Sequence, residues 1–183
     1  MRRVFLFFVP LLLVLAGCSS MKVEDFKSEK PELDLFEYFE GETVAWGWFE
    51  DRFGTVKRQF RVDITGTVSN SALTLDEDFF YRDGERSQRV WTITRDGTNG
   101  YIGTAADIVG EARGTVSGNA LNWKYTLALP VGGSVYHVDF DDWMFLQDGG
   151  VLMNRAIVTK WGFEVGRVSL VFQKQQSLIQ AAQ

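Results

Sequence analysis

The sequence predicts an all-β fold in which short antiparallel strands follow one another as a meander. From Thr43 onward, apolar and polar residues alternate with a period of two, the repeat of a half-buried strand. Pairs such as Asp83-Gly84 and Asp96-Gly97 interrupt the alternation at short intervals and are typical of hairpin turns. The composition, with 18 Gly and 15 Phe but 3 Pro, suits strands and tight turns better than helices. Together these features favour a sandwich or an up-and-down barrel, and a closed barrel has no exposed edges.

A short helix is expected ahead of the strands, over residues 32–40. Pro31 precedes it, acidic residues occupy its first turn and a glycine follows it, which are helix start and stop signals. Leu35, Phe36 and Phe39 would lie on one side of this helix or 3-10 turn. Such an element could plug the open end of a barrel.

Nine to eleven strands are expected between residues 43 and 173. Leu121, Trp123 and Tyr125 alternate with polar neighbours and so define one apolar face of their strand. A transmembrane barrel is the alternative, but the outward faces hold Lys, Arg and Asp where a lipid-facing band is needed. The expected strands span residues 43–49, 56–66, 72–81, 85–95, 100–104, 109–116, 120–129, 134–140 with a continuation or restart over 143–146, 151–160 and 163–173.

The amino-terminal segment has the three-part layout of a secretory signal. Arg2 and Arg3 form a positive region, and the apolar run 4–15 is too short to stay in a bilayer as a helix. Leu15-Ala16-Gly17-Cys18 resembles the lipobox of bacterial lipoproteins. The resemblance implies that residues 1–17 are a signal peptide and that Cys18 is lipidated. An ordinary signal peptide with an incidental cysteine is the alternative.

The lipobox resemblance also implies a location. Cys18 is the only cysteine, so an exported chain has no disulfide to make, and lipidation accounts for it. Ser19 stands where Asp would favour retention in the inner membrane, so we expect an outer-membrane anchor facing the periplasm. Residues 18–30 are expected to form the lipidated cysteine and a flexible tether, residues 31–174 the barrel domain and residues 175–183 a polar tail.

Composition and motifs exclude several classes of function. The chain is acidic, with a net charge of −5 and no basic stripe, which disfavours nucleic acid as a partner. His137 is the only histidine, which argues against a histidine-based zinc site. Ser134 and His137 would lie on opposite faces of one strand, which argues against a nucleophile–base pair. We therefore assign no catalytic residue, metal or cofactor from the sequence.

Four stretches carry a family resemblance that covers the mature chain. They are residues 75–79, 83–91, 103–112 and 141–144. With them the chain resembles an uncharacterised family of proteobacterial lipoproteins, domain of unknown function 3833. More loosely, a short helix, Gly41 and a first-strand Trp46 make the chain similar to lipocalins and their calycin relatives. That pattern has Gly and Trp two residues apart, whereas here they are five apart. The resemblance implies a lipocalin-like barrel with Arg155 or Arg167 over the first-strand Trp.

Candidate ligand-binding residues follow from the expected barrel interior. Large aromatic side chains would line or fill it. Arg155 could face inward and bind a carboxylate head group, although a structural position over Trp46 or Trp48 is favoured. The candidate ligand-binding residues are Trp46, Trp48, Trp91, Glu111, Tyr125, Trp143 and Arg155.

Two sets of acidic residues, the aspartates at 139, 141 and 142 and the single residue Glu77, each give a hypothesis. Asp139 and Asp141 would share one face of a strand and Asp142 the other, so the cluster could hold a cation or share a proton. Turn capping and exposure to solvent are the favoured interpretation. Glu77 is expected to be solvated on the face opposite Leu75; if it points inward, Arg89 or Arg155 is its natural partner.

Three functions remain open from the sequence. The first is a carrier for an apolar ligand, such as a fatty acid or lipid, held in the barrel. The second is a scaffold lipoprotein that acts through a protein partner. The third is an enzyme, or the accessory subunit of a lipid-modifying enzyme, with two inward carboxyl groups as acid and base; Asp141 and Glu111 are the candidates. The absence of a catalytic signature favours a non-enzymatic role.

Overall fold

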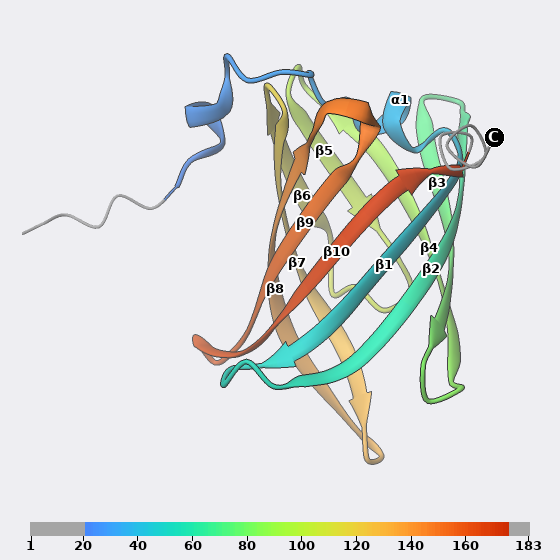
Figure 1. Ribbon diagram of the computed structural model, residues 1–183, viewed down its shortest axis with the longest axis vertical. Coiled ribbons are helices and arrows are strands. Elements are labelled where there is room, and N and C mark those ends of the chain that lie inside the picture. Colours follow the sequence, from blue (N-terminus) through green and yellow to red (C-terminus); the bar gives the residue numbers. More distant parts are fainter. Residues whose placement is uncertain (1–20, 176–183) are drawn as a thin grey trace, which may run out of the picture.

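The chain forms a closed antiparallel barrel. The computed structural model describes residues 21–175, and these residues contain ten strands, one short α-helix and two 3-10 turns. Each strand pairs with its neighbours in the sequence, and β1 also pairs with β10, which closes the sheet (Figure 1). The predicted all-β meander barrel with a short amino-terminal helix is therefore confirmed.

The element bounds place every strand end at a short turn or loop. The helical elements are η1 (Val23–Phe26), α1 (Leu35–Phe39) and η2 (Asp148–Gly150). The strands are β1 (Gly41–Asp51), β2 (Val56–Ser69), β3 (Ala72–Tyr81), β4 (Arg86–Asp96), β5 (Gly100–Thr104), β6 (Ala112–Ser117), β7 (Ala120–Val131), β8 (Ser134–Leu146), β9 (Leu152–Lys160) and β10 (Phe163–Lys174).

Several expected strand ends shift by one to three residues, and two differences, in β8 and β6, have a structural reason. The strands expected over 134–140 and 143–146 are one continuous strand, β8. The strand expected from residue 109 begins only at Ala112, because the preceding loop bonds across to β7 instead. In that loop Ile108 forms an isolated bridge with Leu127, and the amide of Val109 donates to Thr126.

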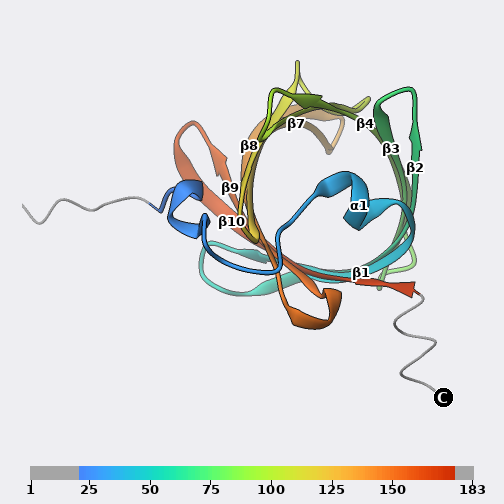
Figure 2. The same ribbon diagram turned by 90° about the horizontal axis from the view of Figure 1, so that it is seen from above.

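Helix α1 plugs the end of the barrel that we call the upper end (Figure 2). Asp34 caps it, accepting hydrogen bonds from the amides of Phe36 and Glu37. The apolar face buries Leu35, Phe36 and Phe39, as the sequence predicts. Beneath the helix, the upper end is tightly packed by side chains with almost no exposure: Ile64, Leu73, Leu121 and Leu152.

The segment before α1 packs against the outside of the barrel. Within η1, Val23 is buried, and the ring of Phe26 lies 6.1 Å from that of Trp143 and 5.1 Å from that of Phe145. The amide of Leu33 donates to the carbonyl of Gly118, in the β6–β7 turn. A flexible tether over residues 18–30 is therefore corrected for residues 21–30, because apolar side chains in this stretch find partners on the barrel.

Several expectations from the sequence concern residues outside the range 21–175. The signal peptide 1–17, Cys18 with its lipidation, and positions 176–183 of the expected tail lie outside the described residues. Within residues 21–175, no helix is long and apolar enough to cross a membrane.

The interior tolerates no side chain at two glycines beside Trp123. A Cβ atom at Gly103 would lie 2.7 Å from Cζ2 of Trp123, and a Cβ atom at Gly114 would overlap the same indole. We predict that Gly114→Ala lowers the free energy of unfolding by about 1–3 kcal/mol through overpacking. Urea unfolding followed by circular dichroism measures this.

The matched control is the same substitution in a Trp123→Phe background. The smaller ring leaves room for the added methyl group, so Gly114→Ala should cost less there than in the wild-type chain. An equal loss in both backgrounds would show that the indole is not what restricts this position.

Candidate functional site

The barrel encloses a cavity of about 420 Å³ that extends from beneath α1 to the hairpins at the opposite end. Period two brings alternate residues of every long strand to this space, and most of them are apolar. Leu35 and Phe39 of α1 bound its upper end, whereas Leu129 and Val165 lie near the hairpins. The aromatic part of the wall comprises Phe49, Phe60, Phe79, Tyr81, Trp91, Trp123, Tyr125, Phe140 and Phe172.

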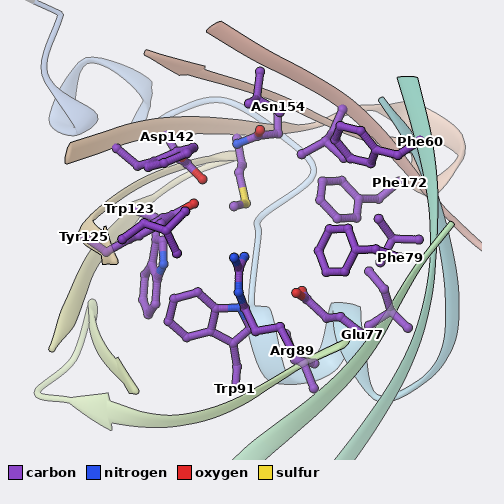
Figure 3. Close-up of a pocket in the computed structure, with 18 of the residues that line it drawn as sticks. Phe60, Glu77, Phe79, Arg89, Trp91, Trp123, Tyr125, Asp142, Asn154 and Phe172 are labelled. Atoms are coloured by element: carbon purple, nitrogen blue, oxygen red, sulfur yellow. The ribbon is translucent and has the colours of Figure 1, made fainter. Parts of the chain in front are cut away.

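Polar side chains reach the same cavity, and five of them come from five different strands (Figure 3). Arg89 and Glu77 lie on neighbouring strands at paired positions of β4 and β3. Asp142 and Asn154 approach from β8 and β9, on another part of the wall (Figure 3). Tyr125 of β7 completes the group. We call these five residues, Glu77, Arg89, Tyr125, Asp142 and Asn154, the inner polar cluster.

Arg89 is held by a carboxylate from outside the regular strands. Its Nη2 atom lies 2.7 Å from Oδ2 of Asp107, and its Nε atom lies 3.1 Å from Oδ1, which makes the pair bidentate. Asp107 comes from the loop between β5 and β6. Burial opposes the positive charge, but Glu77 and Asp107 outweigh it and raise the pKa of Arg89. Arg89 is therefore a fixed cation whose charge is largely balanced by protein groups.

The two carboxyl groups of the inner polar cluster have pKa values raised to near neutral pH. Burial raises the pKa of Glu77 to about 7, against the lowering effect of Arg89. Burial also raises the pKa of Asp142 to about 8, and the charge of Asp141 adds to that effect. At neutral pH, Asp142 is mostly protonated and can donate a hydrogen bond.

Within residues 21–175, Asp142 and Asn154 carry buried polar atoms that make no hydrogen bond of good geometry, although their side chains lie close enough for Asn154 to lower the pKa of Asp142 slightly against the effect of burial. Asp142 is 6% exposed and Asn154 is 4% exposed. Among residues 21–175, neither Oδ1 of Asp142 nor the amide nitrogen and oxygen of Asn154 makes a hydrogen bond. Unpaired buried groups of this kind destabilise a fold by about 1–3 kcal/mol each. Because they border the cavity, they can bind a complementary group on a ligand.

The sequence-derived candidates divide between the inside and the outside of the barrel. Trp91 and Tyr125 lie on the cavity wall. Trp46 and Trp48 point outward, 41% and 39% exposed, and border a shallow groove over β1 and β2. The one inward position between them is Gly47, and its lack of a side chain leaves room for Leu170. Whether Trp91 and Tyr125 bind a ligand stays a prediction.

The other three candidates also lie outside the cavity. Trp143 packs under Phe26 on the outer face of β8, and Arg155 is exposed beside it on β9. Glu111 is exposed in the loop before β6 and bonds Arg113 at 2.9 Å. The implied contact of a late-strand arginine with Trp46 is corrected as well, since Arg167 pairs instead with Glu164 at 2.7 Å.

The expected orientation of Glu77 is wrong. Leu75 and Glu77 are two residues apart in one strand, so they share a face, and both line the cavity. Of the two partners proposed for an inward Glu77, Arg89 is adjacent and Arg155 faces outward. The expected inward placement of Arg155 is also wrong. Asn154 faces the cavity, so the next residue along β9, Arg155, faces outward.

The aspartate cluster of β8 is split between the two faces, as the alternation predicts. Asp139 accepts a hydrogen bond from Thr126 at 2.7 Å, and Asp141 lies 3.0 Å from Nζ of Lys124, both on the outer face. There they border a polar groove with Glu111. Asp142 alone faces inward, so the favoured interpretation, solvent exposure, fails for it. Within the described ranges, no group of three or more His, Cys, Asp or Glu side chains could hold a metal ion.

Sequence reasoning missed three polar groups that shape the site. Asn154 lies between Leu152 and Ala156 on the buried face of β9, and that alternation was the available signal. Arg58 borders the cavity near the hairpins, 3.4 Å above the ring of Tyr81 and paired with Asp83 at 3.2 Å. No sequence pattern indicated that Asp107 would reach Arg89, because its position depends on how the β5–β6 loop folds.

Together the fold and the cavity define a lipocalin-like antiparallel barrel with an enclosed, mainly apolar pocket. The chain belongs to the DUF3833 family, described as proteins of unknown function, whose sequence profile matches residues 12–174. The structure is similar to that of the S-type phycobiliprotein lyase CPES from Guillardia theta, with a TM-score of 0.54 and 9% sequence identity. The similarity covers 83% of this chain and 96% of that one, and at this identity it shows the fold alone. No curated protein matches the sequence.

The raised pKa of Asp142 predicts a pH-dependent stability. Between about pH 4 and pH 8 the folded protein holds a proton that the unfolded chain, in which the aspartate has its ordinary pKa of 3.8, has released. Stability therefore falls as pH rises through this window, by up to about 1.4 kcal/mol per pH unit from this group. Asp142→Asn should remove that slope and become progressively more stable than wild type from pH 5 to pH 8. Chemical denaturation at several pH values measures this.

Asp139→Asn is the matched control, on the same strand but facing outward. Its slope between pH 5 and pH 8 should equal that of wild type. If Asp142→Asn also keeps the wild-type slope, Asp142 titrates normally and is not held neutral by burial.

Proposed function

We propose that the barrel binds and carries one apolar small molecule of the fatty-acid or lipid class. The observation that carries this proposal is the cavity inside the barrel, with an aromatic wall and with the buried polar atoms of Asp142 and Asn154 on its border. Its volume of about 420 Å³ lies within the range of about 300–1,000 Å³ typical of ligand pockets.

The inner polar cluster supports a particular ligand orientation. Because Asp107 already balances Arg89, the site favours an uncharged polar group, such as a protonated carboxyl, an ester carbonyl or a hydroxyl. That group would bond Asp142 and Asn154, whose polar atoms lack partners. The hydrocarbon part would lie against aromatic rings such as Phe79 and Phe140, toward the hairpins.

We also propose that the protein is a lipoprotein of the outer membrane that faces the periplasm. The support is the lipobox-like sequence ending at Cys18, followed by Ser19. Three acyl chains would hold the barrel durably, since each buried methylene contributes about 0.8 kcal/mol. Metabolic labelling with a radioactive fatty acid, compared with Cys18→Ala, tests the anchor separately from the cavity.

Native mass spectrometry tests the ligand proposal. A chain beginning at Ser19 retains all ten strands, so it should be purified natively and examined beside a solvent extract. A stoichiometric lipid mass would establish a carrier and identify its ligand class. Apo protein that stays apo after incubation with cell-envelope lipids would contradict the proposal and favour a scaffold with a protein partner.

Filling the cavity should abolish binding without unfolding the barrel. Val168 of β10 lines the cavity, whereas Val171 on the same strand faces outward. We predict that Val168→Phe weakens binding of the uncharged fluorescent probe N-phenyl-1-naphthylamine by roughly tenfold or more, because the ring occupies space that the probe needs. Fluorescence titration measures the affinity.

Val171→Phe is the matched control, because it makes the same change outside the cavity. It should bind the probe as wild type does. Equal loss in both variants would indicate general damage to the barrel, and no loss in either would place the probe elsewhere.

A second candidate function is acid–base chemistry on the bound lipid. Glu77 and Asp142 favour it, since they are two inward carboxyl groups with raised pKa values, the condition that the enzyme hypothesis sets. Asp141 and Glu111 do not meet this condition, because both lie on the outer face. Incubation with an envelope lipid extract, followed by lipid mass spectrometry, separates the two functions. A carrier returns every lipid unchanged, whereas an enzyme alters one species and Glu77→Gln abolishes the change.

A further inference from the structure

Exposed apolar side chains are concentrated at the hairpin end of the barrel. Four hairpins, β1–β2, β3–β4, β7–β8 and β9–β10, lie at the end opposite α1 (Figure 1). At their tips Trp161 is 85% exposed, Phe53 is 78% exposed and Phe163 is 73% exposed. We call the six exposed residues Phe53, Val131, Val135, Tyr136, Trp161 and Phe163 the rim cluster.

The rim cluster spans three neighbouring hairpins, and contacts join one hairpin to the next. The amide of Arg52 in the β1–β2 turn donates to the carbonyl of Val165 on β10, which joins the first hairpin to the last. Nζ of Lys160 lies 3.6 Å from the ring centre of Tyr136 and 4.4 Å from that of Trp161, which joins β8 to β9–β10. Leu129 and Val165, which line the cavity at this end, are 39% and 37% exposed, and we call the part of the cavity that they border its mouth. An apolar surface of this kind marks an interaction site.

The charges at this end fit a lipid surface. Several carboxylates at the tips are paired, as Asp83 is with Arg58 and Glu164 is with Arg167. By contrast, Arg52, Arg82 and Lys160 form no ion pair among residues 21–175. Unpaired cations beside exposed aromatic rings are typical of segments that enter the headgroup region of a bilayer. They stand out in a chain whose net charge is −5.

Trp161, at the tip of the β9–β10 hairpin, has a backbone conformation that is unfavourable for a bulky residue. Its φ is +52° and that of Gly162 is +80°, the pattern of a type I′ turn, in which Asn-Gly is the preferred pair. A bulky residue at positive φ is strained, and an 85% exposed indole gains little from packing in return. The exposed side chain of Trp161 is therefore better explained by contact with another molecule than by a contribution to folding.

We propose that the rim cluster docks on an anionic lipid bilayer and so places the mouth of the cavity at the membrane. Protruding tips insert into a deformable headgroup region without needing the concave partner that a protein would have to provide. The aromatic rings enter the interface, while Arg52, Arg82 and Lys160 meet lipid phosphates. This docking does not depend on which ligand the cavity holds.

Vesicle co-sedimentation tests the docking surface. The chain beginning at Ser19 should bind phosphatidylglycerol–phosphatidylethanolamine vesicles more tightly than phosphatidylcholine vesicles, and added salt should weaken the difference. Trp161→Asn should weaken binding by about tenfold, because it removes one inserted ring. The same variant should unfold at an equal or higher temperature, since Asn-Gly suits the turn.

Two controls make the outcome specific. Trp161→Phe should retain most of the binding, and Trp46→Ala, which removes an exposed indole from the barrel wall, should retain all of it. Unchanged vesicle binding by Trp161→Asn would overturn the proposal. Sedimentation velocity is run in parallel: a wild-type dimer that Trp161→Asn converts to a monomer would also overturn it, because the rim would then be a contact between two copies.

Discussion

The pairing of β1 with β10 is the constraint on which the rest of the structure depends. Once the sheet is closed, every strand has two neighbours, and alternate side chains must point into one confined space. Side chains fill the upper end of this interior more densely than the rest. At the upper end, α1 and the fully buried aliphatic residues Leu73 and Leu152 pack densely. Below them, large rings line the wall and leave space between them, and this difference creates the cavity.

The inner polar cluster is the part of the interior that stability alone does not explain. The ion pair Arg89–Asp107 is only partly buried, and pairs that remain in contact with solvent contribute little to stability. Among residues 21–175, Oδ1 of Asp142 and the side-chain amide of Asn154 are buried without a hydrogen bond of good geometry, which is unfavourable. These groups border one mainly apolar chamber, where they can orient a ligand. Their placement is therefore better explained by recognition than by folding.

The sequence predicted the fold well because hairpin turns and period-two alternation are local signals. It predicted the site poorly because alternation says which residues share a face but not which face is inside. On β1 the large residues Trp46 and Trp48 face outward, and small inward residues such as Gly47 make room for Leu170. On β8, Trp143 is covered by Phe26 from the segment before the barrel, a contact between residues far apart in the sequence. Asp142 is inside as a consequence.

The position of η1 limits how an anchored barrel can meet membranes. The described chain begins beside the upper end, where Phe26 and Leu33 pack near the β6–β7 turn, whereas the rim cluster lies at the opposite end (Figure 1). With Cys18 lipidated, as proposed, only Ser19 and Ser20 separate the anchor from Met21, a span on the order of 10 Å. The short span keeps the anchoring membrane near the upper end of the barrel. The rim then meets the same bilayer only when the barrel lies on its side, and an upright barrel presents its mouth to a different surface.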